Sequence, residues 1–316
     1  MINDELIRAL FAEDLNIIFA AAYGSYSRGE EAYIKGHDGI SRLFNDFDLV
    51  VVVKDMNLFS QRIAYYQENL VRIVGGAEVD LLVLDKPLSF RRKSTIWYND
   101  FRFTKKFFLG GLDEMELYFG ELKPHNISVF DVYALFVTRS WAAGCLSANL
   151  IEEPYTLFFK RYQAAKLVIA TVDLYLLAHS KYKTMLDDKL VALQSIDDDF
   201  ATYLIPKFVT AVQVKLSPTM DLRSEASADF GGAEEYLSDY NHAFSTYLSS
   251  KIFASDTMLK IFMAVRYLKT LAFGKDKVVA KKLRSRHRIA ALVRAHGKDK
   301  TSINYNKQLV ENFINS

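Results

Sequence analysis

The sequence is poor in cysteine, in net charge and in long apolar runs, and each shortage excludes a class of protein. Its 316 residues contain one cysteine, Cys145, so a disulfide scaffold is excluded. Lysine and arginine total 40 against 38 aspartate and glutamate, and the formal charge of +2 is too small for a protein that coats nucleic acid. No apolar run approaches the roughly 20 residues that a membrane span needs.

The first residues also lack the pattern of an export signal. Acidic residues stand at Asp4, Glu5 and Glu13, and no basic segment precedes an apolar one. Together with the single cysteine, this predicts a cytoplasmic protein without a membrane span. Half of the residues are hydrophobic, which excludes a disordered chain and indicates a packed core.

The first third of the chain alternates between helical and extended patterns. The predicted segments are helices over 3–16 and 58–73 and strands over 17–23, 47–53 and 78–84. Asn3 is a plausible cap for the first helix. This order of elements is typical of a small mixed α/β unit. Between 99 and 122 the pattern is weaker and predicts extended segments around Gly110 and Gly111.

Beyond Pro124 the pattern is helical alone. The predicted helices cover 129–150, 155–179, 187–196, 201–216, 234–248, 257–273 and 279–296. We therefore predict an α+β protein, with a small mixed-sheet domain over residues 1–123 and an all-helical domain over residues 124–316.

Three short segments of the first domain carry groups suited to phosphate chemistry. Gly24 and Ser25 follow a strand and open a helix, where free N–H groups and a partial positive charge favour a phosphate. Asp46 and Asp48 stand two apart at the start of the next strand, so both project from one face. Asp80 lies in a third strand that can pair beside them. Three carboxylates on one face repel one another without cations, and their oxygens suit Mg²⁺.

This ordered set resembles the nucleotidyltransferase superfamily of the polymerase β type, over residues 1–85. The shared elements are Gly24-Ser25, Asp46-Phe47-Asp48 and Asp80. The resemblance implies that the three aspartates are catalytic and bind two Mg²⁺ ions. It also implies that Gly24 and Ser25 hold the β- and γ-phosphates of a nucleoside triphosphate, with ATP as the expected nucleotide. Asp80 would act as, or assist, the base that deprotonates the acceptor.

The gap between Ser25 and Asp46 is longer than in many members of the superfamily. Long gaps occur in stand-alone members of the polysaccharide-locus type, which also carry an arginine, a lysine and a tyrosine in the helical domain. By this likeness the candidate nucleotide-binding residues of the second domain are Arg139, Lys166 and Tyr182.

Two further residues have competing interpretations. Glu78 shares a face with Asp80 and is the rival third acid. Asp80 is preferred because it directly precedes an apolar run, and an acid that opens a buried strand is costly unless it is paired or metal-bound. Arg28 is a predicted phosphate contact, and an ion pair with Glu30 or Glu31 is the alternative.

The segment 275–300 is strongly basic. Ten lysines or arginines against two aspartates give it a net charge of +8. Such a helix can contact nucleic acid, an anionic acceptor or the triphosphate, and a solvated helix face is the alternative.

The predicted function is transfer of a nucleoside monophosphate from a nucleoside triphosphate to an acceptor hydroxyl, with release of pyrophosphate. The helical domain is expected to bind the nucleobase or the acceptor, which would be a sugar or other small molecule, a protein or a second nucleotide. Two alternatives remain open: a cyclic-oligonucleotide synthase of the bacterial immune type, and a non-catalytic nucleotide-binding module that keeps the fold.

Overall fold

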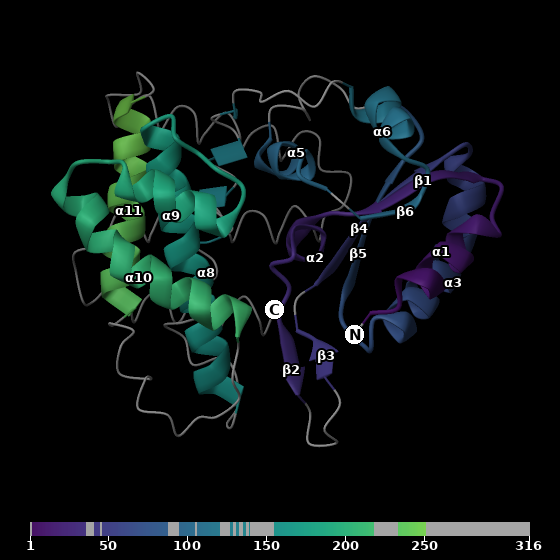
Figure 1. The fold of residues 1–316 in the computed structure, drawn as a ribbon, viewed down its shortest axis with the longest axis horizontal. Coiled ribbons are helices and arrows are strands. Elements are labelled where there is room, and N and C mark those ends of the chain that lie inside the picture. Colours follow the sequence, from purple (N-terminus) through teal and green to yellow (C-terminus); the bar gives the residue numbers. More distant parts are fainter. Residues whose placement is uncertain are drawn as a thin grey trace, which may run out of the picture. The chain divides into compact units, whose positions relative to one another are not determined.

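The computed structural model describes residues 2–35, 41–44, 46–87, 95–104, 106–120, 127–128, 131–132, 135–136, 139, 155–217 and 233–250. The chain divides into two compact units, residues 1–131 with 216–218 and residues 132–215 with 219–316, and we describe each unit by itself (Figure 1). The predicted α+β class is confirmed. The predicted domain boundary at 123/124, Cys145 and the basic segment 275–300 lie outside the described residues.

A four-stranded mixed sheet forms the centre of the first unit, in the strand order β5-β4-β1-β6. Its strands are β1 (Ile17–Ala22), β4 (Phe47–Val53), β5 (Val79–Leu84) and β6 (Phe107–Leu109). β4 runs parallel to β5 and antiparallel to β1, and β6 runs antiparallel to β1. A separate hairpin joins β2 (Tyr33–Lys35) to β3 (Ser41–Leu43). The three strands predicted in this region are confirmed.

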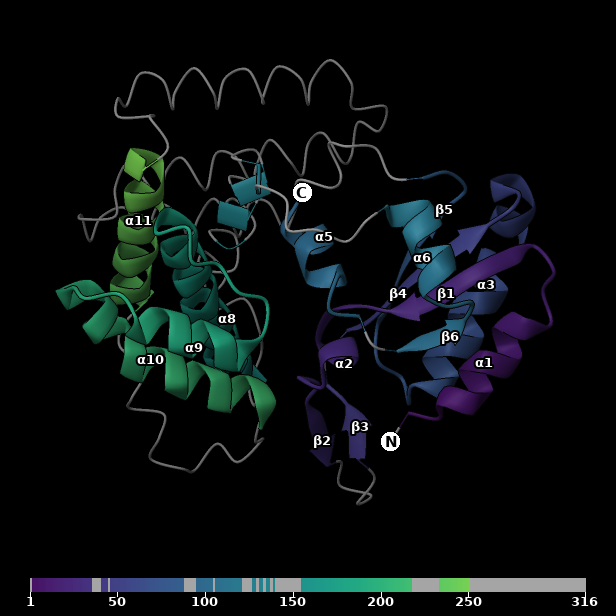
Figure 2. The ribbon, with the colours of Figure 1, turned by 45° about the horizontal axis from the view of Figure 1, so that its top comes forward.

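Helices cover both faces of the four-stranded sheet (Figure 2). α1 (Asp4–Ala12) and α3 (Met56–Ile73) cover one face, and α5 (Ile96–Phe101) and α6 (Leu112–Phe119) cover the other. Successive strand residues alternate between the two cores: Leu49 packs in the α1–α3 core, and Val50 packs in the α5–α6 core. The two predicted helices of this unit are confirmed as α1 and α3.

The region 99–122 departs from the prediction of extended segments. Among the described residues of this region, β6 is the one strand, and α5 and α6 flank it. The start of α6 is fixed by Glu114, whose carboxylate accepts a hydrogen bond from the Gly111 N–H at 2.8 Å. Its buried residues are Met115 and Phe119, four apart on one side of the helix. Leu112 is 63% exposed. Because apolar residues also stand on the solvent side of α6, the sequence does not show the helical spacing of its buried residues.

The second unit is helical in its described part. Its helices are α8 (Tyr155–Ala178), α9 (Leu186–Gln194), α10 (Asp199–Leu216, whose last residue belongs to the first unit) and α11 (Ala233–Ser250). These four confirm the helices predicted over 155–179, 187–196, 201–216 and 234–248. The helices predicted over 257–273 and 279–296, and most of the one over 129–150, lie outside the described residues.

A buried ion pair joins two helices of this second unit. Lys189 Nζ on α9 lies 2.7 Å from Asp173 Oδ1 on α8, and both residues are buried. Tyr240 on α11 adds a hydrogen bond from its hydroxyl to the Leu135 carbonyl oxygen at 3.1 Å.

Across the described ranges, no helix is both long enough and apolar enough to cross a membrane.

Candidate functional site

The three predicted acids, Asp46, Asp48 and Asp80, stand at the starts of two neighbouring strands. Asp48 is the direct partner of Asp80 in the parallel ladder between β4 and β5. Asp46 directly precedes β4, two residues before Asp48. Asp48 is half-buried, whereas Asp46 and Asp80 are exposed. We call these three residues the acidic row.

The acidic row lies on the α5–α6 side of the sheet. Val50 follows Asp48 at a spacing of two, and Leu82 follows Asp80 in the same way; both pack in the core beneath α5 and α6. Phe47, between the two acids of β4, is fully buried in the opposite core. Phe47 and Leu49 thus face the α1–α3 core, on the side of the sheet opposite to Asp48.

Tyr23 continues this row onto β1. Ala22 pairs with Leu49 in the antiparallel ladder, and the Tyr23 N–H donates a hydrogen bond to the Asp48 carbonyl oxygen at 3.0 Å. The register thus sets Tyr23 opposite Asp48, and residues opposite each other on neighbouring strands share a face. Tyr23 also packs against the α5–α6 core. Tyr23, Asp48 and Asp80 consequently form a line across three adjacent strands.

Burial and the three carboxylates all raise the pKa of the Tyr23 hydroxyl. Burial has the largest effect, and the charges of Asp48, Asp80 and Asp46 raise the pKa further. The neighbouring Trp97 indole acts in the opposite direction, because an N–H group near the oxygen favours the phenolate. The phenol is thus kept in its protonated form beside the acidic row.

Gly24 makes the closest approach to Asp48. Its φ of +68° belongs to the left-handed region, and a Cβ atom added there would lie 2.0 Å from Asp48 Oδ2. A side chain at position 24 would therefore collide with the carboxylate. Gly24 opens the five-residue helix α2 (Gly24–Arg28), in which Ser25 is buried. The structure thus brings the predicted Gly-Ser turn and the acidic row together.

Arg28 forms ion pairs within the protein. Its Nε lies 3.0 Å from Glu30 Oε2, and its Nη1 lies 3.8 Å from Asp100 Oδ2, with only 11% of the arginine side chain exposed. The Glu30 pair is one of the alternatives weighed from the sequence, and it is confirmed. Asp100 belongs to α5, so Arg28 links α2 to the helix that carries Trp97. A phosphate contact by Arg28 stays a prediction.

The register also bears on the choice between Asp80 and Glu78. Glu78 precedes β5, and its carbonyl oxygen accepts a hydrogen bond from the Phe47 N–H at 2.7 Å. Asp80 is the residue directly beside Asp48. The sequence analysis preferred Asp80 because an acid that opens a buried strand is costly unless it is paired or metal-bound. That premise was wrong, because Asp80 is exposed and β5 is only partly buried.

The acidic row fits a hard cation in its chemistry. Carboxylate oxygens are ligands that Mg²⁺ prefers, and Asp48 and Asp80 stand on strands that neighbour each other. Among the residues that the structure describes, no three His, Cys, Asp or Glu side chains are gathered as a ready metal-binding group. A metal at the row is therefore a proposal from the donor chemistry.

The candidate nucleotide contacts of the second unit have partners of their own. Lys166 Nζ on α8 lies 4.7 Å from the centroid of the Tyr162 ring, and Lys189 Nζ lies 5.4 Å from the centroid of the Tyr182 ring. Burial raises the pKa of Tyr240, and the charge of Arg139 acts against that rise. Nucleotide binding by Arg139, Lys166 and Tyr182 stays a prediction.

Tyr23 and Trp97 lie beside the acidic row, and the sequence motif did not predict either of them there. Trp97 lies in α5, which begins at the Thr95 cap, and its ring meets the edge of Tyr23 at 5.5 Å between centroids and 82° between planes. Its other neighbour is Phe101, stacked at 5.4 Å. The position of Tyr23 directly before Gly24 was the available signal. Nothing in the sequence links it to a tryptophan more than seventy residues later.

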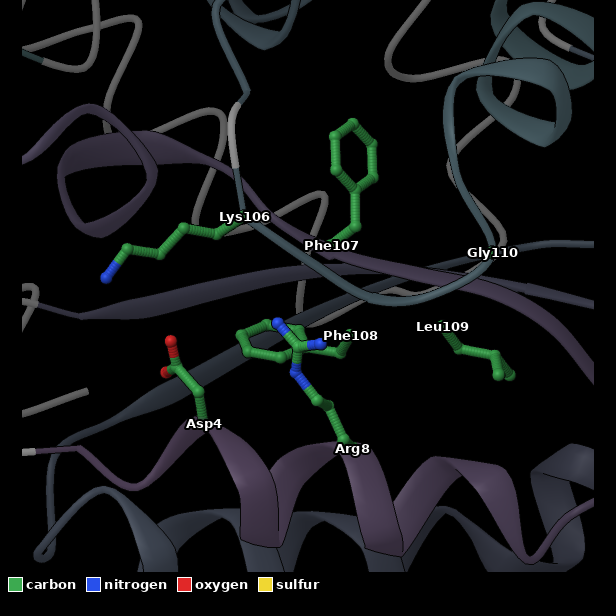
Figure 3. Close-up of a pocket in the computed structure, with 7 residues that line it drawn as sticks. All are labelled: Asp4, Arg8, Lys106, Phe107, Phe108, Leu109 and Gly110. Atoms are coloured by element: carbon green, nitrogen blue, oxygen red, sulfur yellow. The ribbon is translucent and has the colours of Figure 1, made fainter.

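An open cavity of about 450 Å³ lies at the opposite edge of the sheet, beside β6 (Figure 3). Asp4 and Arg8 of α1 line it together with residues 106–110, and no member of the acidic row does. Its polar groups are engaged locally. Lys106 Nζ lies 3.6 Å from the centroid of the Tyr26 ring, and the Tyr26 hydroxyl donates a hydrogen bond to Asp4 at 2.5 Å.

Comparisons with protein-family models, with curated proteins and with solved structures find no match to this chain. Its function must then be inferred from the chemistry of the acidic row.

Proposed function

We propose that the chain is a Mg²⁺-dependent nucleotidyltransferase that moves a nucleoside monophosphate from a triphosphate, with ATP as the expected nucleotide, to an acceptor hydroxyl. The observation that supports this most strongly is the register that sets Asp48 beside Asp80, with Gly24 packed against the Asp48 carboxylate. Like charges at adjacent strand positions are unfavourable. A row of this kind at a strand end favours a bound cation, and with it an anionic phosphate.

The residues of the row have distinct proposed parts. Asp46, Asp48 and Asp80 would hold Mg²⁺, which when bound neutralises phosphate charge and aligns the reacting oxygens. The acceptor oxygen forms a bond to the α-phosphorus, and the bond from that phosphorus to the pyrophosphate oxygen breaks. A carboxylate of the row, Asp80 in our proposal, takes the proton of the acceptor hydroxyl. The Gly24-Ser25 turn would hold the departing phosphates.

The direct test is transfer from ATP labelled at the α-phosphate, with the full chain, Mg²⁺ and a panel of hydroxyl acceptors. Asp48→Asn should lower pyrophosphate release at least about 1000-fold, because it removes a charge that the transition state needs. Asp85→Asn is the matched control, since Asp85 is an exposed aspartate just beyond the other end of β5. Equal rates for wild type and Asp48→Asn would contradict the proposal.

The same assay separates the alternatives. Labelled oligonucleotides that form without any added acceptor would indicate the cyclic-oligonucleotide synthase. Nucleotide binding that depends on Mg²⁺, without any labelled product across the acceptor panel, would indicate the non-catalytic module. Contact with nucleic acid through 275–300 is tested separately by the salt dependence of RNA binding.

A further inference from the structure

We propose that Tyr23 is a phosphate-contacting residue: its hydroxyl donates a hydrogen bond to an oxygen of the nucleotide bound at Asp48 and Asp80. This inference rests on the proposed function. It adds to the acidic row a side chain that the sequence motif does not contain.

The position of Tyr23 follows from the strand register. Neighbouring strands lie about 4.8 Å apart, and Tyr23 occupies the place beside Asp48 on one side that Asp80 occupies on the other. Its N–H bond to the Asp48 carbonyl oxygen fixes that place at 3.0 Å. A ligand held between Asp48 and Asp80 therefore lies about one and a half strand spacings, roughly 7 Å, from the Tyr23 backbone, a span that a tyrosine side chain can cover.

Trp97 fixes the place of the Tyr23 ring. A phenol hydroxyl has one proton to donate and two lone pairs that accept, so it can donate to a phosphate oxygen while it accepts from another group. The edge-on contact at 5.5 Å and the ion pair between Arg28 and Asp100 hold α5, and with it Trp97, against this end of β1.

A donor at this position has a clear use. Ionised carboxylates accept hydrogen bonds and cannot donate them, so Asp46, Asp48 and Asp80 alone would repel a phosphate wherever a cation does not intervene. The Tyr23 hydroxyl is a neutral donor on the same face. It can therefore bind a phosphate oxygen without adding to the negative charge of the row.

The test compares binding of Mn²⁺ alone, followed by electron paramagnetic resonance, with binding of a non-hydrolysable ATP analogue in the presence of Mn²⁺. Tyr23→Phe keeps the ring and removes only the hydroxyl. We expect unchanged affinity for Mn²⁺ alone and an affinity for the analogue lower by about tenfold or more, the loss of one hydrogen bond to a charged group. Tyr65→Phe is the control, because Tyr65 is a 48%-exposed tyrosine on α3.

A merely structural role predicts a different pattern. If Tyr23 only supported Asp48, Tyr23→Phe would weaken Mn²⁺ alone and the analogue together, and that result would overturn the inference. Unchanged affinity for both would also overturn it. In either case the proposed function stands if Asp48→Asn loses Mn²⁺. If wild type and Asp48→Asn bind Mn²⁺ and the analogue equally, the proposed function fails and the inference with it.

Trp97 supplies a second readout that does not depend on turnover. The chain has two tryptophans, so Trp141→Phe leaves Trp97 as the only indole. Binding of the ATP analogue should shift its emission, because the Tyr23 side chain that packs against Trp97 gains a new partner. Adding Tyr23→Phe should abolish the shift under saturating analogue. A shift that persists would contradict the contact.

Discussion

Both ends of the β1–β4 pair carry aspartates, but the surroundings of these aspartates differ. At one end a buried aspartate accepts several hydrogen bonds, and at the other end two aspartates lie side by side. Where β1 begins, Asp14 accepts hydrogen bonds from the Asn16 N–H, from Arg62 and from the Tyr66 hydroxyl. Where β1 ends, Asp48 faces Asp80 and approaches Gly24. Within the described ranges, neither Asp46 nor Asp80 forms an ion pair with a lysine or arginine.

The first end stabilises the fold. Asp14 is 6% exposed, yet each of its oxygens has a donor. The Asn16 side chain extends this network by two hydrogen bonds to the backbone of Asp55, which caps α3. We call this set the Asp14 network. A satisfied buried acid contributes to the stability of the fold, whereas like charges at neighbouring strand positions weaken it. In the proposed function, a bound cation would offset that cost at the second end.

The largest effect is expected from a substitution in the acidic row. Asp48→Asn should lower nucleotidyl transfer at least about 1000-fold, about 4 kcal/mol in activation free energy. It should change the free energy of unfolding less than Asp14→Ala does, because Asp48 is only half-buried and lies beside the like charge of Asp80. Transfer assays and urea unfolding of the same preparation check both halves, and a loss of stability as large as that of Asp14→Ala would refute the contrast between the two ends.

The next effect breaks the Asp14 network. Asp14→Ala should lower the free energy of unfolding by about 3 kcal/mol, because Arg62 and Tyr66 lose their common buried partner. Glu13→Ala is the neighbouring control, since Glu13 is exposed and should change stability little. Urea unfolding measures both variants. Equal stability of the two would show that the network does not hold the fold.

A pair of glycines sharpens the comparison at the site itself. Gly24 and Gly29 have similar φ values of +68° and +72°, but only at Gly24 would a Cβ atom meet Asp48. Each change to alanine should cost about 1–2 kcal/mol of stability from backbone strain. Gly24→Ala alone should also weaken Mg²⁺-dependent nucleotide binding. Equal nucleotide affinities in the two variants would show that the contact with Asp48 is unimportant.

The smallest effect is a pH dependence of the Asp14 network. Burial tends to raise the pKa of Asp14, but the hydrogen bonds from Tyr66 and Asn16 and the charge of Arg62 outweigh it and hold the pKa below its ordinary value. The stabilisation is therefore present above the unfolded-state pKa of about 4 and is lost as the pH falls through the lower folded-state value. Unfolding titrations below pH 5 should show a shallower decline in Asp14→Ala than in wild type; parallel declines would contradict this assignment.

Much of the fold was predictable because its signals are local. The β-branched run that became β4 and the Asn3 cap of α1 needed no tertiary information. β6 and α6 were not predictable in the same way. β6 is three residues long and is defined by its pairing with β1. In α6, the exposed Leu112 and Leu117 are apolar like the buried residues, so the sequence pattern does not distinguish the two sides of the helix.

The sequence predicted the acidic residues of the candidate site but not the residues that lie beside them. The sequence itself sets Asp46 two residues before Asp48, at the start of a strand that it predicts. The pairing of Asp48 with Asp80, and of Tyr23 with Asp48, depends on strand order and direction, which are tertiary facts. The partners of Arg28 and the contact between Trp97 and Tyr23 depend on where α5 docks, and the weak pattern around 99 did not show that helix.

The central claim is that the acidic row is a cation-dependent nucleotide site, and unfolding with and without Mg²⁺ tests it most directly. A ligand that binds only the folded state raises the free energy of unfolding with its concentration. Mg²⁺ with a non-hydrolysable ATP analogue should stabilise the wild type, and the Asp48→Asn/Asp80→Asn double variant should show no such gain. Equal stabilisation of the two proteins by Mg²⁺ and nucleotide would contradict the account.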